Sequence, residues 1–125
     1  MRTQLKLTRD GDVFIARLAP SQVAAMHEAL SHLRGHYAGD TELTLLVGAG
    51  RDEVDALLER LAGPHTQSRD FRLATEELHT VHAAPTMFLV QGGVFAEEPF
   101  HIRLGFYREN FDALAHALLW AAAEA

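Results

Sequence analysis

The stretch GAGRDEVDAL at residues 48–57 recurs as GFYRENFDAL at residues 105–114, with its glycine, arginine and aspartate in step. Upstream, RLA at residues 17–19 recurs as RLA at residues 72–74, at an offset of 55 residues instead of 57. Similarity between two unrelated amphipathic helices would not readily keep these three residue types aligned. The pattern predicts a tandem duplication of a strand–helix–short helix–helix unit, with repeats at about 12–63 and 67–123.

The predicted fold is α+β, mainly helical, in a single domain of 125 residues with a small antiparallel sheet. Asp10-Gly11 favours a two-residue hairpin turn, because this pair tolerates positive φ angles. Strands are expected at residues 3–8 and 12–18, with Leu7 opposite Phe14, and a third at about 69–73 is expected to join them.

The helices follow from apolar periodicity and from the residues at their ends. One helix is expected to begin at Pro20 and to end near Gly35, and its equivalent to begin near Thr75 and to kink or end near Ala84, before Pro85. Residues 43–47 fit either a buried strand or a short helix. The acids, proline and terminal glycine of residues 97–105 favour short helices closed by glycine in both repeats, followed by helices at 51–61 and 108–123.

Composition restricts the class of protein. The formal net charge of −6 makes contact with a nucleic-acid backbone unfavourable, and we expect none. The chain has no cysteine, which removes thiolate chemistry and favours the cytoplasm. Alanine abundance and a single lysine suggest a bacterial source. The N-terminus lacks the apolar run of a signal peptide, and the longest apolar tract is too short for a membrane span.

The helix expected at 108–123 is apolar on two sides. Its predicted core face matches that of the earlier helix, whereas its reverse side carries Ala113, His116, Ala117 and Trp120 with scarcely a charge. A helix that is apolar all round is normally covered on both sides. We expect a homodimer with Trp120 as anchor; the alternative is that the hairpin or the first helix covers this face within one chain.

Aromatic side chains gather in the longer loop of the second repeat. Phe95, Phe100, Phe106 and Tyr107 surround a segment that contains Gln91-Gly92-Gly93. The functional interpretation is a recognition surface for a protein partner, and the structural alternative is additional core for the longer loop.

Three histidines are the candidate ligands for a metal ion. His27 and His82 occupy equivalent repeat positions, and His79 lies one helical turn before His82. A small-ligand or metal-binding protein using these residues is the alternative function, although the carboxylate that usually completes a helical histidine site is absent. A histidine hydrogen-bonded at the edge of the core is the commoner arrangement.

The remaining motifs carry little chemistry. Residues 48–51 resemble part of a phosphate-binding loop, but the second repeat has Tyr107 in place of Gly50, so Gly48 is interpreted as a helix terminator and Gly50 as incidental. Acids at residues 52–55 oppose DNA binding by a helix-turn-helix. The best of the weak candidates for an acid–base pair is His101 with Glu97 or Glu98. We predict no catalytic residue and no cofactor. The sequence therefore favours a non-catalytic protein-interaction or regulatory module.

Overall fold

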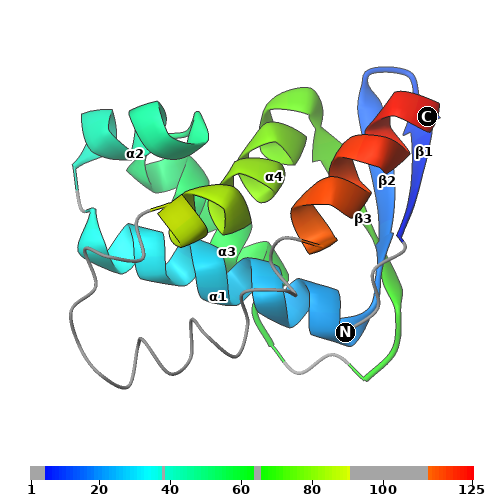
Figure 1. Cartoon of the computed structure of the whole chain (residues 1–125), viewed down its shortest axis with the longest axis horizontal. Coiled ribbons are helices and arrows are strands. Elements are labelled where there is room, and N and C mark those ends of the chain that lie inside the picture. The colour runs from blue at the N-terminus through cyan, green and yellow to red at the C-terminus, as the bar shows by residue number, and fades with distance from the viewer. Residues whose placement is uncertain (1–4, 38, 64–65, 91–112) are drawn as a thin grey trace.

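The computed structural model describes residues 5–37, 39–63, 66–90 and 113–125. A mostly helical α+β fold is confirmed, with the elements shown in Figure 1. In chain order these are β1 (Lys6–Asp10), β2 (Val13–Leu18), α1 (Pro20–His36), α2 (Asp40–Val47), α3 (Arg51–Leu61), β3 (Arg69–Ala74) and α4 (Thr75–Val90). A further helix spans residues 113–124 and is called the C-terminal helix.

The three strands form one antiparallel sheet in the order β1-β2-β3. The prediction that the third strand joins the hairpin is confirmed, with Ala16 opposite Leu7 of β1 and opposite Phe71 of β3. These three residues point to the same side of the sheet and are buried. Since side chains alternate along a strand, the sheet has one apolar face and one polar face.

The hairpin register differs from the prediction by two residues. Leu7 lies opposite Ala16 instead of Phe14, and Asp10 pairs with Val13, so the turn residues are Gly11 and Asp12. Gly11 has a φ of 62°, whereas Asp12 is not left-handed. A two-residue turn with positive φ at its first position only is a type II′ turn, in which glycine occupies that first position. A shift by two keeps every side chain on its predicted face, which is why alternation did not reveal the error.

The first three helices agree closely with their predictions. α1 begins at Pro20 and ends one residue beyond Gly35, and α3 has the predicted bounds. The ambiguous segment before Gly48 is helical, and Gly48 ends it in the left-handed conformation with a φ of 75°. Glycine adopts this conformation without the steric penalty of a β-carbon.

The sequence predicted either a kink or an end of the fourth helix near Ala84; the end is wrong, because α4 continues through Pro85 to Val90. Proline costs this helix one internal hydrogen bond. Residues on both sides of Pro85, including Ala84 and Phe88, are almost fully buried. Burial of these apolar side chains offsets the local cost and keeps the segment helical.

The apolar face of the sheet, which runs along one side of the molecule in Figure 1, packs against α4, whereas α3 packs on α1, and α2 packs on α4 away from the sheet. The core joins Phe14, Phe71, Leu30, Phe88 and Leu118 from the sheet, α1, α4 and the C-terminal helix. On the opposite face, two ion pairs at 3.2 Å link the strands: Arg17 of β2 pairs with Asp70 of β3, and Arg72 of β3 reaches across β2 to Asp10 of β1. The fold therefore has two layers, with the strands' polar face toward solvent.

None of the helices in the described ranges is both long and apolar enough to cross a membrane.

Candidate protein-interaction surface

The C-terminal helix buries one face and exposes another. Leu114 and Leu118, one turn apart, are almost completely buried against the core. Leu119 and Trp120 follow directly, and they are 55% and 67% exposed. Because large apolar side chains at this exposure sit next to each other, this end of the helix presents an apolar surface to solvent.

A groove separates this helix from β1, the outer strand of the sheet on that side. Its volume is about 670 Å³. We call it the β1 groove, and its lining is mainly apolar: Leu5, Lys6, Leu7, Ala113, His116, Ala117, Trp120, Ala121 and Glu124. Two charged residues, Lys6 and Glu124, lie within this otherwise apolar lining. The arrangement offers apolar contact area together with charges of both signs.

His116 and Trp120 stack on each other at the wall of the β1 groove. Their ring centroids are 5.8 Å apart and the rings are inclined by 22°. The two residues are one helical turn apart, so the helix itself holds the rings in this arrangement. Stacking reduces the freedom of the Trp120 side chain, and less entropy is lost when a partner covers it.

All four residues predicted as interface line the β1 groove. Ala113, His116, Ala117 and Trp120 therefore lie together, next to β1. Ala117 is already buried within the chain, whereas His116 and Trp120 remain exposed. Cover from the same chain thus reaches one edge of this face, and the rest is open among the residues that the structure describes.

Two further histidines lie where α4 meets the C-terminal helix. His79 and His82 line a small pocket together with Leu118 and Leu119. Burial lowers the pKa of His82, and the neighbouring His79 lowers it further; a hydrogen bond to the Ala115 backbone opposes these effects, and the nearby His116 adds to them. The uncharged imidazole is therefore the form that suits this interface.

The structure does not bring His27 to the other two predicted metal ligands. His27 lies in a separate pocket between α1 and the end of α3, lined by Pro20, Ser21 and Leu61 among others. Within the described ranges, no group of three or more histidine, aspartate or glutamate side chains is arranged to hold a metal ion. His79 instead packs over the α2 terminus, where a β-carbon on Gly48 would lie 2.7 Å from its ring.

The glycine loop before α3 is filled by the protein's own carboxylate. An Asp40 oxygen accepts a hydrogen bond of 2.6 Å from the backbone N–H of Arg51, at the first turn of α3. A β-carbon on Gly50 would lie 2.6 Å from that same oxygen. The interpretation of Gly50 as incidental is therefore wrong, because its lack of a side chain makes room for Asp40. The Asp40 carboxylate therefore occupies the position at the start of α3 where a phosphate would bind.

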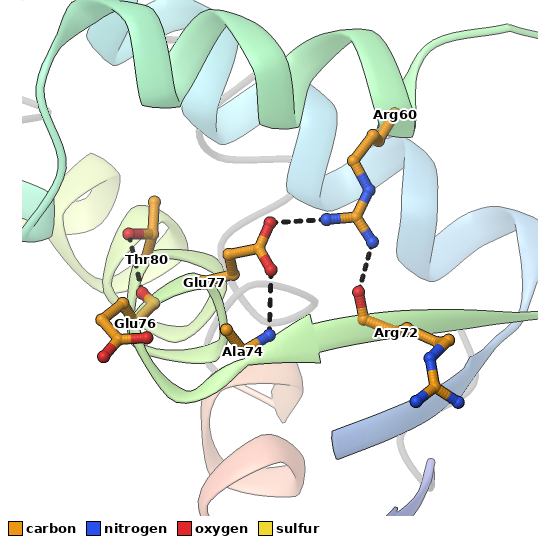
Figure 2. A network of polar contacts seen from close by, with 6 residues as sticks. All are labelled: Arg60, Arg72, Ala74, Glu76, Glu77 and Thr80. Atoms are coloured by element: carbon orange, nitrogen blue, oxygen red, sulfur yellow. Dashed lines mark hydrogen bonds and ion pairs between the residues drawn. The ribbon is translucent and has the colours of Figure 1, made fainter. Parts of the chain in front are cut away.

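Hydrogen bonds that periodicity cannot reveal hold the helices in place. The buried Thr80 hydroxyl of α4 lies 2.8 Å from the Val47 carbonyl oxygen and donates to it at the end of α2. Figure 2 shows Arg60 of α3 donating to Glu77 at 2.5 Å and to the Arg72 carbonyl, while the Ala74 amide donates to the other Glu77 oxygen at 2.9 Å. Sequence reasoning missed the contacts of Thr80 and Arg60, since their partners are distant along the chain.

The predicted recognition residues Phe95, Phe100, Phe106 and Tyr107 lie outside the described residues. The same holds for His101, Glu97 and Glu98, and for the second-repeat glycine, Gly105.

Comparison with known proteins gives no relationship: no family model, no curated protein and no solved structure matches this chain significantly.

Proposed function

We propose that this chain is a non-catalytic protein-interaction module of a bacterial cytoplasmic protein, and that it self-associates through its C-terminal helix. The observation that carries the proposal is the exposed Trp120, stacked on His116 at the wall of the apolar β1 groove. Tryptophan is enriched among the residues that contribute most to binding energy at protein interfaces. Leu119 extends the same apolar surface toward α4.

The proposal includes a regulatory role, exerted by binding a protein partner. The dimer would present the binding surface for that partner in two copies. This role rests on apolar contact and not on a group of titratable side chains. The best-defined histidine group, His79 with His82, contacts a helix terminus and a helix junction. Both contacts stabilise the fold, so we assign these histidines to structure.

We further propose that the domain arose by duplication of a strand–helix–short helix–helix unit. Ala19 and Gln22 at the start of α1 correspond to Ala74 and Glu77 at the start of α4. In each pair the alanine amide donates to the side-chain oxygen three residues ahead, at 2.8 Å and 2.9 Å. The equivalent strands β2 and β3 pair antiparallel, with Ala16 opposite its repeat equivalent Phe71.

The two histidine pockets support the same relationship. The pocket at His27 also contains Ala24, Leu61 and Ala62, and the pocket at His82 contains their repeat equivalents. Those equivalents are His79, Leu118 and Leu119. The C-terminal helix thus packs on α4 as α3 packs on α1. In this proposal, the second unit kept the packing and acquired the exposed tryptophan.

The self-association is tested by Trp120→Ala in analytical ultracentrifugation at micromolar concentration. We expect the wild type to be a dimer and the variant to dissociate, because truncating a central interface tryptophan costs about 2–4 kcal/mol, or roughly 30-fold to 1000-fold in Kd. The melting temperature of the dissociated variant reports whether its fold is intact.

Leu45→Ala is the matched control. Leu45 is 86% exposed and lies on α2, away from the β1 groove. Its truncation removes a comparable exposed apolar side chain and should leave the dimer unchanged. A monomeric wild type, or equal effects of the two substitutions, would contradict the proposal.

A further inference from the structure

We propose that a second copy of this chain binds along β1, in the two-fold arrangement that joins the two sheets into one of six strands. This inference rests on the proposed self-association and specifies its surface and register. The C-terminal helix contributes Trp120, while the backbone of β1 contributes the pairing. The argument for this arrangement comes from the sheet edges, from the charges along β1 and from the position of the β1 groove.

The two edges of the sheet differ in what covers them. On the β3 side, the Arg60 side chain donates to the Arg72 carbonyl, and Glu77 accepts from the Ala74 amide, so side chains of α3 and α4 occupy the end of that edge nearest α4 (Figure 2). On the β1 side, the only strand paired with β1 in the described ranges is β2. An open strand edge is a template for pairing with another chain.

The charges along β1 are self-complementary. When two copies of β1 pair antiparallel about an axis at Thr8, Lys6 of each copy lies opposite Asp10 of the other. Shifting the axis by one residue toward the turn would place Arg9 opposite Arg9, and shifting it to Lys6 would place two lysines opposite each other. Opposite charges stabilise a cross-strand pair and like charges destabilise it. The axis at Thr8 therefore gives two favourable charge pairs, in which each Asp10 meets Lys6 of the other copy as well as Arg72 of its own chain.

The same axis brings the exposed apolar surfaces together. It runs perpendicular to the sheet, so both helical layers lie on one side of the joined sheet. In each copy the β1 groove separates β1 from the C-terminal helix and is lined by Leu5, Leu7 and Trp120. Pairing along β1 places the two grooves on either side of the seam, where the two Trp120 side chains face a shared apolar region. Strand pairing and helix contact are thus parts of one isologous interface.

The experiment is disulfide cross-linking of Thr8→Cys in the full chain. The wild type has no cysteine, so any disulfide in this variant joins two molecules. Residues directly opposite in an antiparallel pair have Cα atoms about 4.5–5.5 Å apart, within the range that a disulfide spans. Thr8 is exposed, so the substitution leaves the core intact. We expect near-complete cross-linking under mild oxidation, and little for the control Leu45→Cys.

A charge exchange tests the register independently. Lys6→Asp alone and Asp10→Lys alone should each weaken the dimer about tenfold or more, because each turns two attractive pairs into repulsive ones. The double exchange restores opposite charges and should recover most of the affinity. Far-UV circular dichroism checks the fold of each variant.

The outcomes separate the two proposals. A wild type that remains monomeric at micromolar concentration overturns both. A wild-type dimer that weakens with Trp120→Ala, yet shows no preferential cross-linking of Thr8→Cys and no recovery in the double exchange, overturns the β1 arrangement and leaves self-association through the helix standing.

Discussion

Removing the Thr80 hydroxyl should detach the end of α2 from α4. Thr80→Val preserves the size of the side chain and deletes the donor that lies 2.8 Å from the Val47 carbonyl oxygen. Thr80 and Val47 are both buried, so water does not replace the lost donor. A buried acceptor left without a partner costs about 1–3 kcal/mol. For a chain of this length, 1 kcal/mol corresponds to about 4 °C, so the melting temperature should fall by roughly 4–12 °C.

The assay is urea denaturation together with thermal unfolding, and α4 supplies the control. Among the described residues the Thr86 hydroxyl bonds within its own helix, to the His82 carbonyl at 3.4 Å, so Thr86→Val should change stability by less than about 0.5 kcal/mol. Thr80→Ser retains the donor and should recover part of the loss. Equal free energies of unfolding for Thr80→Val and Thr86→Val would refute the role given to the Thr80 hydroxyl.

Two further predictions concern acid and the glycines. The pKa of His82 is lowered in the folded state, chiefly by burial, so the unfolded chain binds more protons as pH falls below about 6.5. Stability should be highest above that pH and decline as pH falls through it, and His82→Gln should flatten the decline in pH-dependent urea titrations. Gly48→Ala should lower the melting temperature, since φ is 75° and His79 fills the space, whereas Gly35→Ala, with no atom within 4 Å of the added carbon, should raise it. Equal effects at the two glycines would contradict the second prediction.

Local signals were sufficient for most elements. Proline at the start of α1, glycine in the left-handed conformation after α2 and the apolar spacing of α3 each encode a boundary within a few residues of chain. Comparison with the similar segment at residues 97–105 predicted that residues 43–47 form a helix and not a strand, and they are helical. These features are predictable because each depends on backbone geometry and on near neighbours.

Distant contacts explain the failures. The continuation of α4 through Pro85 depends on burial of Ala84 and Phe88, which no window around the proline reveals. The role of Gly50 depends on Asp40, whose carboxylate binds the next residue's amide from another helix. The hairpin register failed for a different reason, since a shift by two residues leaves the apolar pattern unchanged.

The sequence predicted which residues form the candidate surface, but not which part of the fold lies beside them. Periodicity grouped Ala113, His116, Ala117 and Trp120 on one side of a helix, and the structure adds β1 as the opposite wall of their groove. That addition changes the kind of partner expected. A helix face alone suits another helix, whereas a helix face next to a strand that is paired on one side only, as β1 is within the described ranges, suits a partner that also supplies a strand.

Adjacency, more than exposure, distinguishes Trp120 from other surface apolar residues. Leu45 is the more exposed of the two, yet its pocket is shared with Asp40, Thr41 and Thr44. Isolated apolar side chains of this kind are normal on soluble proteins. Trp120 instead adjoins Leu119, an apolar groove and the edge of β1. Each feature alone would be unremarkable, but together they place exposed apolar area beside a strand edge that no other described strand pairs with. A second copy would satisfy both requirements in the proposed β1 arrangement, whereas self-association through Trp120 alone would satisfy only the first, and the Thr8→Cys cross-link distinguishes the two.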